Sequence, residues 1–182
     1  MHIETRGKAY HPVYIADYPF ADSLNNRVRP LLENYKGGIG HTNVKAKHSD
    51  CMLMDGNIKV EKIKKYIINE TENKLIPRII DGSQKPGLKI YNFWANKYSK
   101  GDSANSHHHL PTARFSFAYF LKAKWYHSPL VFTYSGKKIR PKEGRFVIFP
   151  GYLYHHVPKH KHNDTRITLS GNLTHIREEV MS

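Results

Sequence analysis

The sequence predicts an α+β domain in which two amphipathic helices precede a long series of short β-strands. Apolar residues recur at helical spacing in two segments of the first half of the chain, whereas from residue 89 onward they alternate with polar ones. Turn residues divide this second half at regular intervals. Helices followed by many evenly spaced strands are typical of a helix-supported antiparallel sandwich or jelly-roll barrel.

The first segment begins with a short β-prone run at residues 13–16 and continues into a helix. Asp22 can cap this helix, Pro30 is expected to kink or interrupt it, and Gly37-Gly38 is expected to end it. Residues 40–55 show no clear period, and we expect a loop there.

The second helix is expected to start after Asn57, a good N-cap residue, and to stop at Pro77. Its apolar stripe comprises Val60, Ile63, Ile67 and Ile68. The polar residues expected to face water are Lys59, Lys62, Lys64, Lys65 and Glu70.

The strand-rich half is expected to form the core of the fold. Residues 89–98 alternate so that one face carries Ile90, Asn92, Trp94, Asn96 and Tyr98. Further strands are predicted over residues 115–122, 130–134, 145–149 and 166–173. We therefore expect a single domain over residues 1–182, with a helical N-terminal support region at 1–86 and a jelly-roll core at 87–175.

The composition indicates a soluble protein with a basic surface. There are 29 Lys and Arg against 15 Asp and Glu, a formal net charge of +14. The lysines are scattered, which favours a solvated surface, with a slight tilt towards an acidic or phosphate-bearing substrate. A single cysteine excludes an internal disulfide, and no signal or membrane-spanning pattern is visible, so a cytoplasmic location without a membrane partner is expected.

The consecutive histidines 107–109 are the best candidate for a functional site. In an extended strand His107 and His109 share a face and can grip a metal ion, while His108 points away. A third ligand would come from His155 or its neighbour His156, both just beyond an apolar strand. Three imidazoles suit iron, zinc, copper or nickel, and the competing interpretation is a polar loop without a metal.

Several motifs resemble those of the 2-oxoglutarate- and Fe(II)-dependent oxygenases, and they follow one another along the chain in the same order as in that family. The resemblance is strongest to small members frequent in phage and marine bacterial genomes and related to prolyl hydroxylases, so a phage-encoded protein is one expectation. The motifs lie at residues 91–102, 115–121, 144–150 and 166–172, and at His107, His109 and His155.

The resemblance implies a double-stranded β-helix, a cupin-like jelly roll, with N-terminal helices packed on it. It implies a hydroxylase that uses Fe(II), 2-oxoglutarate and O2, with His107, His109 and His155 as metal ligands and Arg166 on the distal carboxylate of 2-oxoglutarate. An Arg fork suits a carboxylate because it can donate two charge-assisted hydrogen bonds. Further candidates are Tyr98, Tyr119, Ser116, Ser170 and Asn172 near the cosubstrate, and Asn92, Trp94 and Asn96 near the substrate.

His109 departs from the pattern of the family, which usually has a carboxylate at this position. Replacing a carboxylate by a neutral imidazole removes a negative charge from the metal site. We therefore expect an unusual three-histidine iron centre with altered affinity for anions, a site in which His109 is displaced and an anion takes its place, or a protein that binds metal without hydroxylating.

Two other functions compete with this interpretation. One is a three-histidine dioxygenase or zinc enzyme that does not use 2-oxoglutarate, in which Arg166 would have no carboxylate to bind. The other is a non-catalytic, basic module that binds nucleic acid. The residues expected to stack on bases in that case are Tyr91, Trp94, Tyr126, Tyr152 and Tyr154. The chemical identity of the substrate, whether peptide, nucleotide or small metabolite, is not encoded in any motif.

Overall fold

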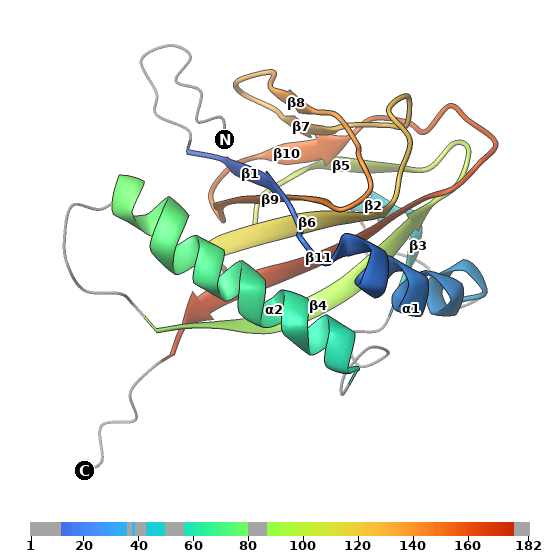
Figure 1. Ribbon diagram of the computed structural model, residues 1–182. Coiled ribbons are helices and arrows are strands. Elements are labelled where there is room, and N and C mark those ends of the chain that lie inside the picture. Colours follow the sequence, from blue (N-terminus) through green and yellow to red (C-terminus); the bar gives the residue numbers. More distant parts are fainter. Residues whose placement is uncertain (1–11, 36–37, 39–42, 50–56, 80–86, 177–182) are drawn as a thin grey trace.

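Two antiparallel sheets face each other and two helices cover one of them (Figure 1). The computed structural model describes residues 12–35, 38, 43–49, 57–79 and 87–176. The major sheet has the strand order β1-β9-β6-β11-β4-β3, and the minor sheet has the order β2-β5-β10-β7-β8. Among the described residues, no helix is long and apolar enough to span a bilayer.

The major sheet combines strands from both halves of the chain. Its members are β1 (Tyr14–Asp17), β3 (Lys47–His48), β4 (Leu88–Tyr98), β6 (Phe115–Lys122), β9 (Arg145–Pro150) and β11 (Arg166–His175). The minor sheet contains β2 (Val44–Lys45), β5 (Ser103–His107), β7 (Leu130–Phe132), β8 (Lys138–Ile139) and β10 (His155–Val157). The N-terminal region thus contributes strands to both sheets as well as the two helices.

Two separate apolar layers follow from the alternation of side chains along the strands of the major sheet. On β6, Phe117 and Tyr119 face the helices, whereas Ala118 and Phe120 face the minor sheet. On β9 the same alternation sends Phe146 towards the helices and Val147 towards the minor sheet. Both faces of the central strands are therefore buried, which explains their nearly continuous apolar sequences.

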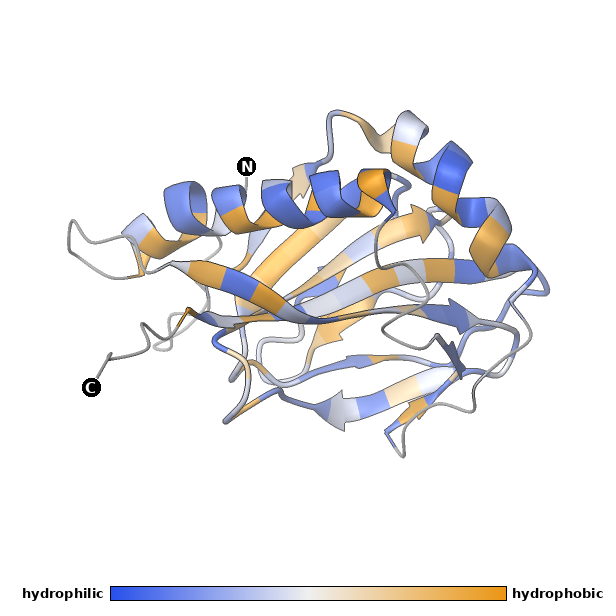
Figure 2. Cartoon of the chain, turned by 90° about the horizontal axis from the view of Figure 1, so that it is seen from below, coloured by the Kyte–Doolittle hydropathy of each residue, from blue (hydrophilic) through white to orange (hydrophobic). Residues whose placement is uncertain are grey.

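The helices α1 (Ala21–Glu33) and α2 (Ile58–Glu70) pack their apolar faces on the major sheet. Figure 2 shows their hydrophobic residues turned towards the strands and their polar residues turned outward. Val28 of α1 and Val60, Ile63 and Ile67 of α2 are fully buried in this layer. As predicted, the side chain of Asn57 accepts a hydrogen bond from the Lys59 amide at 3.1 Å and caps α2.

Several local predictions need correction. The N-cap of α1 is Phe20 rather than Asp22, whose charge lies in the first turn, where it is favourable to the helix dipole. The helix also continues past Pro30 to Glu33, because the burial of Val28 and Leu32 on the sheet outweighs one lost backbone hydrogen bond.

The second helical segment also differs from the prediction. Glu70 does not face water but is buried, where it accepts a hydrogen bond from the Tyr14 hydroxyl. A π-helical turn at Thr71–Leu75 and a 3₁₀ turn at Ile76–Arg78 extend the helix, so Pro77 lies inside the last turn rather than ending α2.

The region expected to be a loop is partly a strand pair. Residues 43–49 contain β2 and β3, each of two residues and too short to show a period, and residues 50–55 lie outside the described part of the chain. The predicted end of α1 at Gly37-Gly38 can be compared only for Gly38, which lies beyond the end of the helix.

Gly171 on β11 makes a direct prediction about stability. A Cβ atom there would lie 2.5 Å from the Phe117 ring and 2.7 Å from the Asn92 carbonyl oxygen, in the middle of the major sheet. We expect Gly171→Ala to lower the free energy of unfolding by about 1–3 kcal/mol, as overpacking does in other cores, measured by urea denaturation.

The matched control is Gly87→Ala. Its Cβ would meet Ile176 at an ordinary 3.4 Å, so the change should stay within about 0.5 kcal/mol. Equal effects of the two substitutions would show that close packing at Gly171 does not limit stability.

Candidate metal centre

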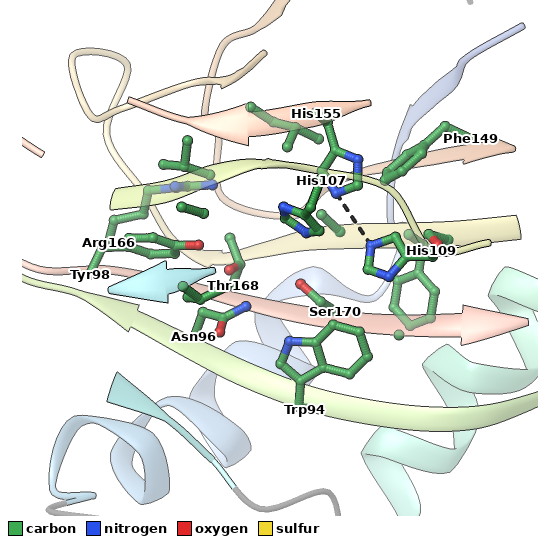
Figure 3. Close-up of a pocket in the computed structure, with 18 residues that line it drawn as sticks. Trp94, Asn96, Tyr98, His107, His109, Phe149, His155, Arg166, Thr168 and Ser170 are labelled. Carbon is green, nitrogen blue, oxygen red and sulfur yellow. Dashed lines mark hydrogen bonds between the residues drawn. The ribbon is translucent and has the colours of Figure 1, made fainter. Parts of the chain in front are cut away.

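Three histidine side chains converge between the two sheets, at the end of β5 and the start of β10. His155 pairs directly with His107 across these antiparallel strands, so both side chains point into the same space. His109 lies two residues beyond the end of β5 and turns back towards them. The ring centroids are 4.4–5.2 Å apart, and one nitrogen of each ring lies within 4.8 Å of the others (Figure 3).

Backbone carbonyls orient two of these rings. His107 Nδ1 lies 2.7 Å from the Asn105 carbonyl oxygen, and His155 Nδ1 lies 2.9 Å from that of Leu153. Because a carbonyl oxygen can only accept, each Nδ1 donates its proton and leaves a lone pair on Nε2. Outer contacts of this kind fix the tautomer of metal-binding histidines in many proteins.

All three rings are neutral at pH 7. Burial lowers the pKa of His107 and of His155, and burial together with the nearby His107 and His108 lowers the pKa of His109 to about 4. A neutral imidazole is the form that binds a metal, so protons compete little for these ligands near neutral pH.

The distance between two of the ring nitrogens fits a first-row transition metal. His109 Nε2 and His155 Nε2 are 3.3 Å apart. Two nitrogens bound to one ion at about 2.1 Å would be about 3.0–3.4 Å apart, depending on the bond angle. His108, as expected, turns away, and its ring lies 4.6 Å from that of Tyr154.

Arg166 lies in the same pocket, and its guanidinium is buried without a counter-charge. The side chain is 1% exposed, and its Nε and Nη1 atoms have no hydrogen-bond partner. It is held between the rings of Tyr98 and Phe120, at 4.8 and 5.2 Å. Burial lowers the pKa of Arg166 to about 10, which leaves the group charged at neutral pH. Unpaired donors on a buried cation provide a site for an anion.

The register of β4 and β11 places the predicted polar residues on one wall of the pocket. Tyr98 pairs with Arg166, Asn96 with Thr168, and Trp94 with Ser170. All six residues line the pocket together with the three histidines. Thr168 was not among the predicted site residues, although the alternation of β11 points to it.

Trp94 and Asn96 have distinct environments on this wall. The Trp94 ring stacks on His48 of β3 at 5.7 Å and lies 6.3 Å from the ring of His109. The Asn96 Oδ1 atom is buried without a partner, so it can accept a hydrogen bond from a ligand.

Three of the predicted site residues do not line the pocket. Tyr119 lies on the opposite face of β6, and its hydroxyl donates to Asn25 at 2.7 Å, because odd-numbered residues of this strand face the helices. Asn172 accepts a hydrogen bond from the Ser116 hydroxyl at 2.8 Å, and Ser116 itself lines the pocket. Asn92 pairs with Asn172 at the far end of β4.

A second group with metal-ligand chemistry lies near Asp164, where His127 Nε2 is 3.2 Å from the Asp164 carboxylate without a well-aligned hydrogen bond and the other donor atoms have partners. His127 Nδ1 accepts the backbone N–H of Lys124 at 3.2 Å, and His160 Nε2 donates to the carbonyl of Asp164 at 2.8 Å. The Asp164 carboxylate is paired with Lys124 at 3.0 Å. These contacts tie the loop before Arg166 to the loop between β6 and β7, which is a structural role.

The comparisons with known proteins agree with the motifs. A family model described as "Putative 2OG-Fe(II) oxygenase" matches residues 131–172, a segment that contains His155 and Arg166. No curated protein sequence matches the chain.

Solved structures with the same fold include two prolyl hydroxylases and an epimerase. One is a prolyl-4-hydroxylase of Pseudomonas putida (15% identity, TM-score 0.64, covering 92% of this chain and 94% of that one). Another is the viral collagen prolyl hydroxylase of Paramecium bursaria Chlorella virus-1 in complex with 2-oxoglutarate (13%, 0.61, 90% and 96%). The third is a non-haem α-ketoglutarate-dependent epimerase of nogalamycin biosynthesis (11%, 0.64, 90% and 76%).

These identities show a shared fold, and the family match covers only a part of the chain. The partial family match and the order of the motifs make the chain similar to the 2-oxoglutarate- and Fe(II)-dependent oxygenases, a superfamily whose members use Fe(II), 2-oxoglutarate and O2.

Proposed function

We propose that the protein is an Fe(II)- and 2-oxoglutarate-dependent dioxygenase, a hydroxylase, built on a double-stranded β-helix. His107, His109 and His155 would hold the metal, and Arg166 would bind the distal carboxylate of 2-oxoglutarate. The observation that carries the proposal is the pairing, in one pocket, of a convergent histidine triad with a buried guanidinium that has free donors.

The residues around the site have roles that follow from their positions. Arg166 can bind a carboxylate through two parallel hydrogen bonds, because stacking on Tyr98 and Phe120 fixes the plane of its guanidinium. The apolar side chains of Leu130 and Val157 from the minor sheet and of Phe149 from the major sheet line the pocket and exclude water. Bound together, the iron and 2-oxoglutarate would supply the oxidising chemistry, in which 2-oxoglutarate is converted to succinate and carbon dioxide.

The charge of the pocket supports a dianionic cosubstrate. Among the described parts of the chain, the residues that line it include one buried cation, Arg166, and no carboxylate. A divalent metal on three neutral histidines would add two further positive charges. A dicarboxylate is therefore the ligand that best compensates the site.

A three-histidine metalloenzyme that does not use 2-oxoglutarate explains the pocket less well. Such an enzyme would leave the buried Arg166 without a partner, at a considerable cost in desolvation. The substrate is a separate question, because the structures that share this fold include prolyl hydroxylases and an epimerase. Prolyl peptides are the first substrates to test, followed by nucleotides and small metabolites.

The test of the cosubstrate is Arg166→Ala. With ferrous iron the wild-type protein should convert 2-oxoglutarate to succinate, slowly even without a second substrate. The variant should raise the KM for 2-oxoglutarate by at least about 30-fold, since losing one partner of a buried charge pair costs about 2–5 kcal/mol. Arg166→Lys keeps the charge but not the fork, and we expect an intermediate KM. If wild-type succinate formation never exceeds the metal-free background, the proposal is wrong.

The ligand set is tested by metal binding rather than by turnover. We expect His155→Ala to weaken the binding of Co(II) or Ni(II), followed by calorimetry, by at least about tenfold. His108→Ala is the matched control, since its ring points away from the centre, and it should bind as the wild type does. Equal metal affinity in both variants would exclude His155 as a ligand.

His109→Asp tests the consequence of the neutral ligand. Linkage requires that metal and dicarboxylate strengthen each other's binding by the same factor. The ligands of the wild type carry no negative charge, whereas in His109→Asp the new carboxylate already compensates the charge of the ion. We therefore expect succinate to increase the Co(II) affinity of the wild type by a factor about tenfold larger than the factor for His109→Asp. Titrating Co(II) with and without succinate measures both factors, and an unchanged ratio would contradict the charge argument.

A further inference from the structure

The outer face of the minor sheet, directly behind the metal ligands, carries an exposed cluster of aromatic rings. Strand alternation produces it, since β10 directs His155 inward and its neighbours Tyr154 and His156 outward. Tyr154 contacts His108 and Tyr134, with ring centroids 4.6 and 5.3 Å away. Tyr134 is 75% exposed, which is unusual for an aromatic side chain that contacts other rings.

Hydroxyl and imidazole groups extend this cluster along the sheet. Thr133 Oγ1 lies 2.7 Å from the Ser106 hydroxyl and 3.1 Å from His156 Nδ1. These contacts connect β5, β10 and the end of β7. The surface therefore offers both ring faces and neutral hydrogen-bonding groups. We call it the tyrosine face, defined by His108, Thr133, Tyr134, Tyr154 and His156.

Basic residues outnumber acidic ones in the segment of sequence that contains the tyrosine face, and one of them, Lys138, lies on a strand of the same sheet. Residues 103–163 contain ten Lys and Arg but one acidic residue, Glu143, which is paired with Arg29 at 2.8 Å. Lys138 on β8 pairs with Val131 on β7, and Val131 pairs with His156 on β10. Lys138 and His156 are therefore two strands apart, with their Cα atoms about 10 Å from each other. Ile139 next to it is buried inward, so Lys138 points to the outer side.

Two of these cations have no acidic partner. Lys138 and the exposed Arg140 form no ion pair with any residue that the structure describes, unlike Lys142, which pairs with Asp17. Lys138, on the strand next to β7, and Arg140, two residues farther along the chain, can contact phosphates, and the rings of the tyrosine face can stack on bases. These are the two features that bind single-stranded nucleic acid.

We infer that the tyrosine face, with Lys138 and Arg140, binds single-stranded nucleic acid. Tyr134 stacks on a base, and the two cations contact neighbouring phosphates. The chain-wide charge of +14 adds long-range attraction. Because His108 and Tyr154 are adjacent in sequence to the proposed metal ligands but point to the outer face, a bound strand lies across the minor sheet from the metal centre. The inference concerns binding and does not depend on the proposed reaction.

An oligothymidine of about 20 nucleotides, longer than a typical single-strand site, is the probe. Fluorescence anisotropy with the full-length protein should show binding that weakens with rising salt. Tyr134→Ala should weaken it at least about fivefold, whereas Tyr134→Phe, which keeps the ring, should not. The double variant Lys138→Glu/Arg140→Glu should reduce the magnitude of the salt slope by about 1.4, since each phosphate contact contributes about 0.7.

The matched control is Lys62→Glu/Lys65→Glu, which makes the same charge change on exposed residues of α2, beyond the major sheet. It should leave the salt slope nearly unchanged. An equal loss in both double variants would show attraction by net charge alone and overturn the inference. If duplex DNA binds as tightly as the single strand, base stacking on Tyr134 does not contribute and the inference is wrong. If polyglutamate of equal charge displaces the strand, the face binds an acidic polypeptide instead of nucleic acid.

Discussion

The antiparallel register between β4 and β11 is the constraint on which the candidate site depends. It sets Tyr98 beside Arg166, and the same alternation sends Phe93, Ala95, Ile167 and Leu169 to the helix side. A slip of one residue would exchange the two faces, burying the polar wall in the apolar layer and exposing apolar side chains in the pocket. The packing of α1 and α2 on the major sheet therefore also protects the geometry of the site.

The minor sheet depends on this frame in a different way. Its strands are short, and one of its pairings, between β10 and β5, joins two histidines on neighbouring strands. Backbone carbonyls then select the tautomers of His107 and His155. The ring orientations of His107 and His155 are thus set by main-chain hydrogen bonds, which substitutions of surrounding side chains disturb little.

The charges of the lining residues determine which ligands the pocket favours. Three neutral rings and one buried cation form a cavity without a compensating carboxylate, in a region where desolvation makes any unpaired charge costly. This arrangement favours a ligand with at least two negative charges. It also explains why His109, which stands where related enzymes usually have a carboxylate, should tie metal binding to anion binding more strongly than is usual.

The sequence alone was sufficient to predict the elements with a strong period. The strand at Phe115–Lys122 was predicted at its observed limits, and the alternation along residues 89–98 identified Trp94, Asn96 and Tyr98 as one wall of the site. His107 and His109 were recognisable because two imidazoles on one face of a strand can bind a metal, whereas the roles of His155 and Arg166 followed from the resemblance to the oxygenases.

Only the tertiary structure could decide the rest, because those features depend on contacts between distant segments. The two-residue strands β2 and β3 have no period of their own and exist through pairing with β5 and β4. Tyr119 has the chemistry of a site residue, but the face of β6 that it occupies is fixed by packing on α1. The burial of Glu70 follows in the same way from its bond with Tyr14, a residue that lies 56 positions earlier in the chain.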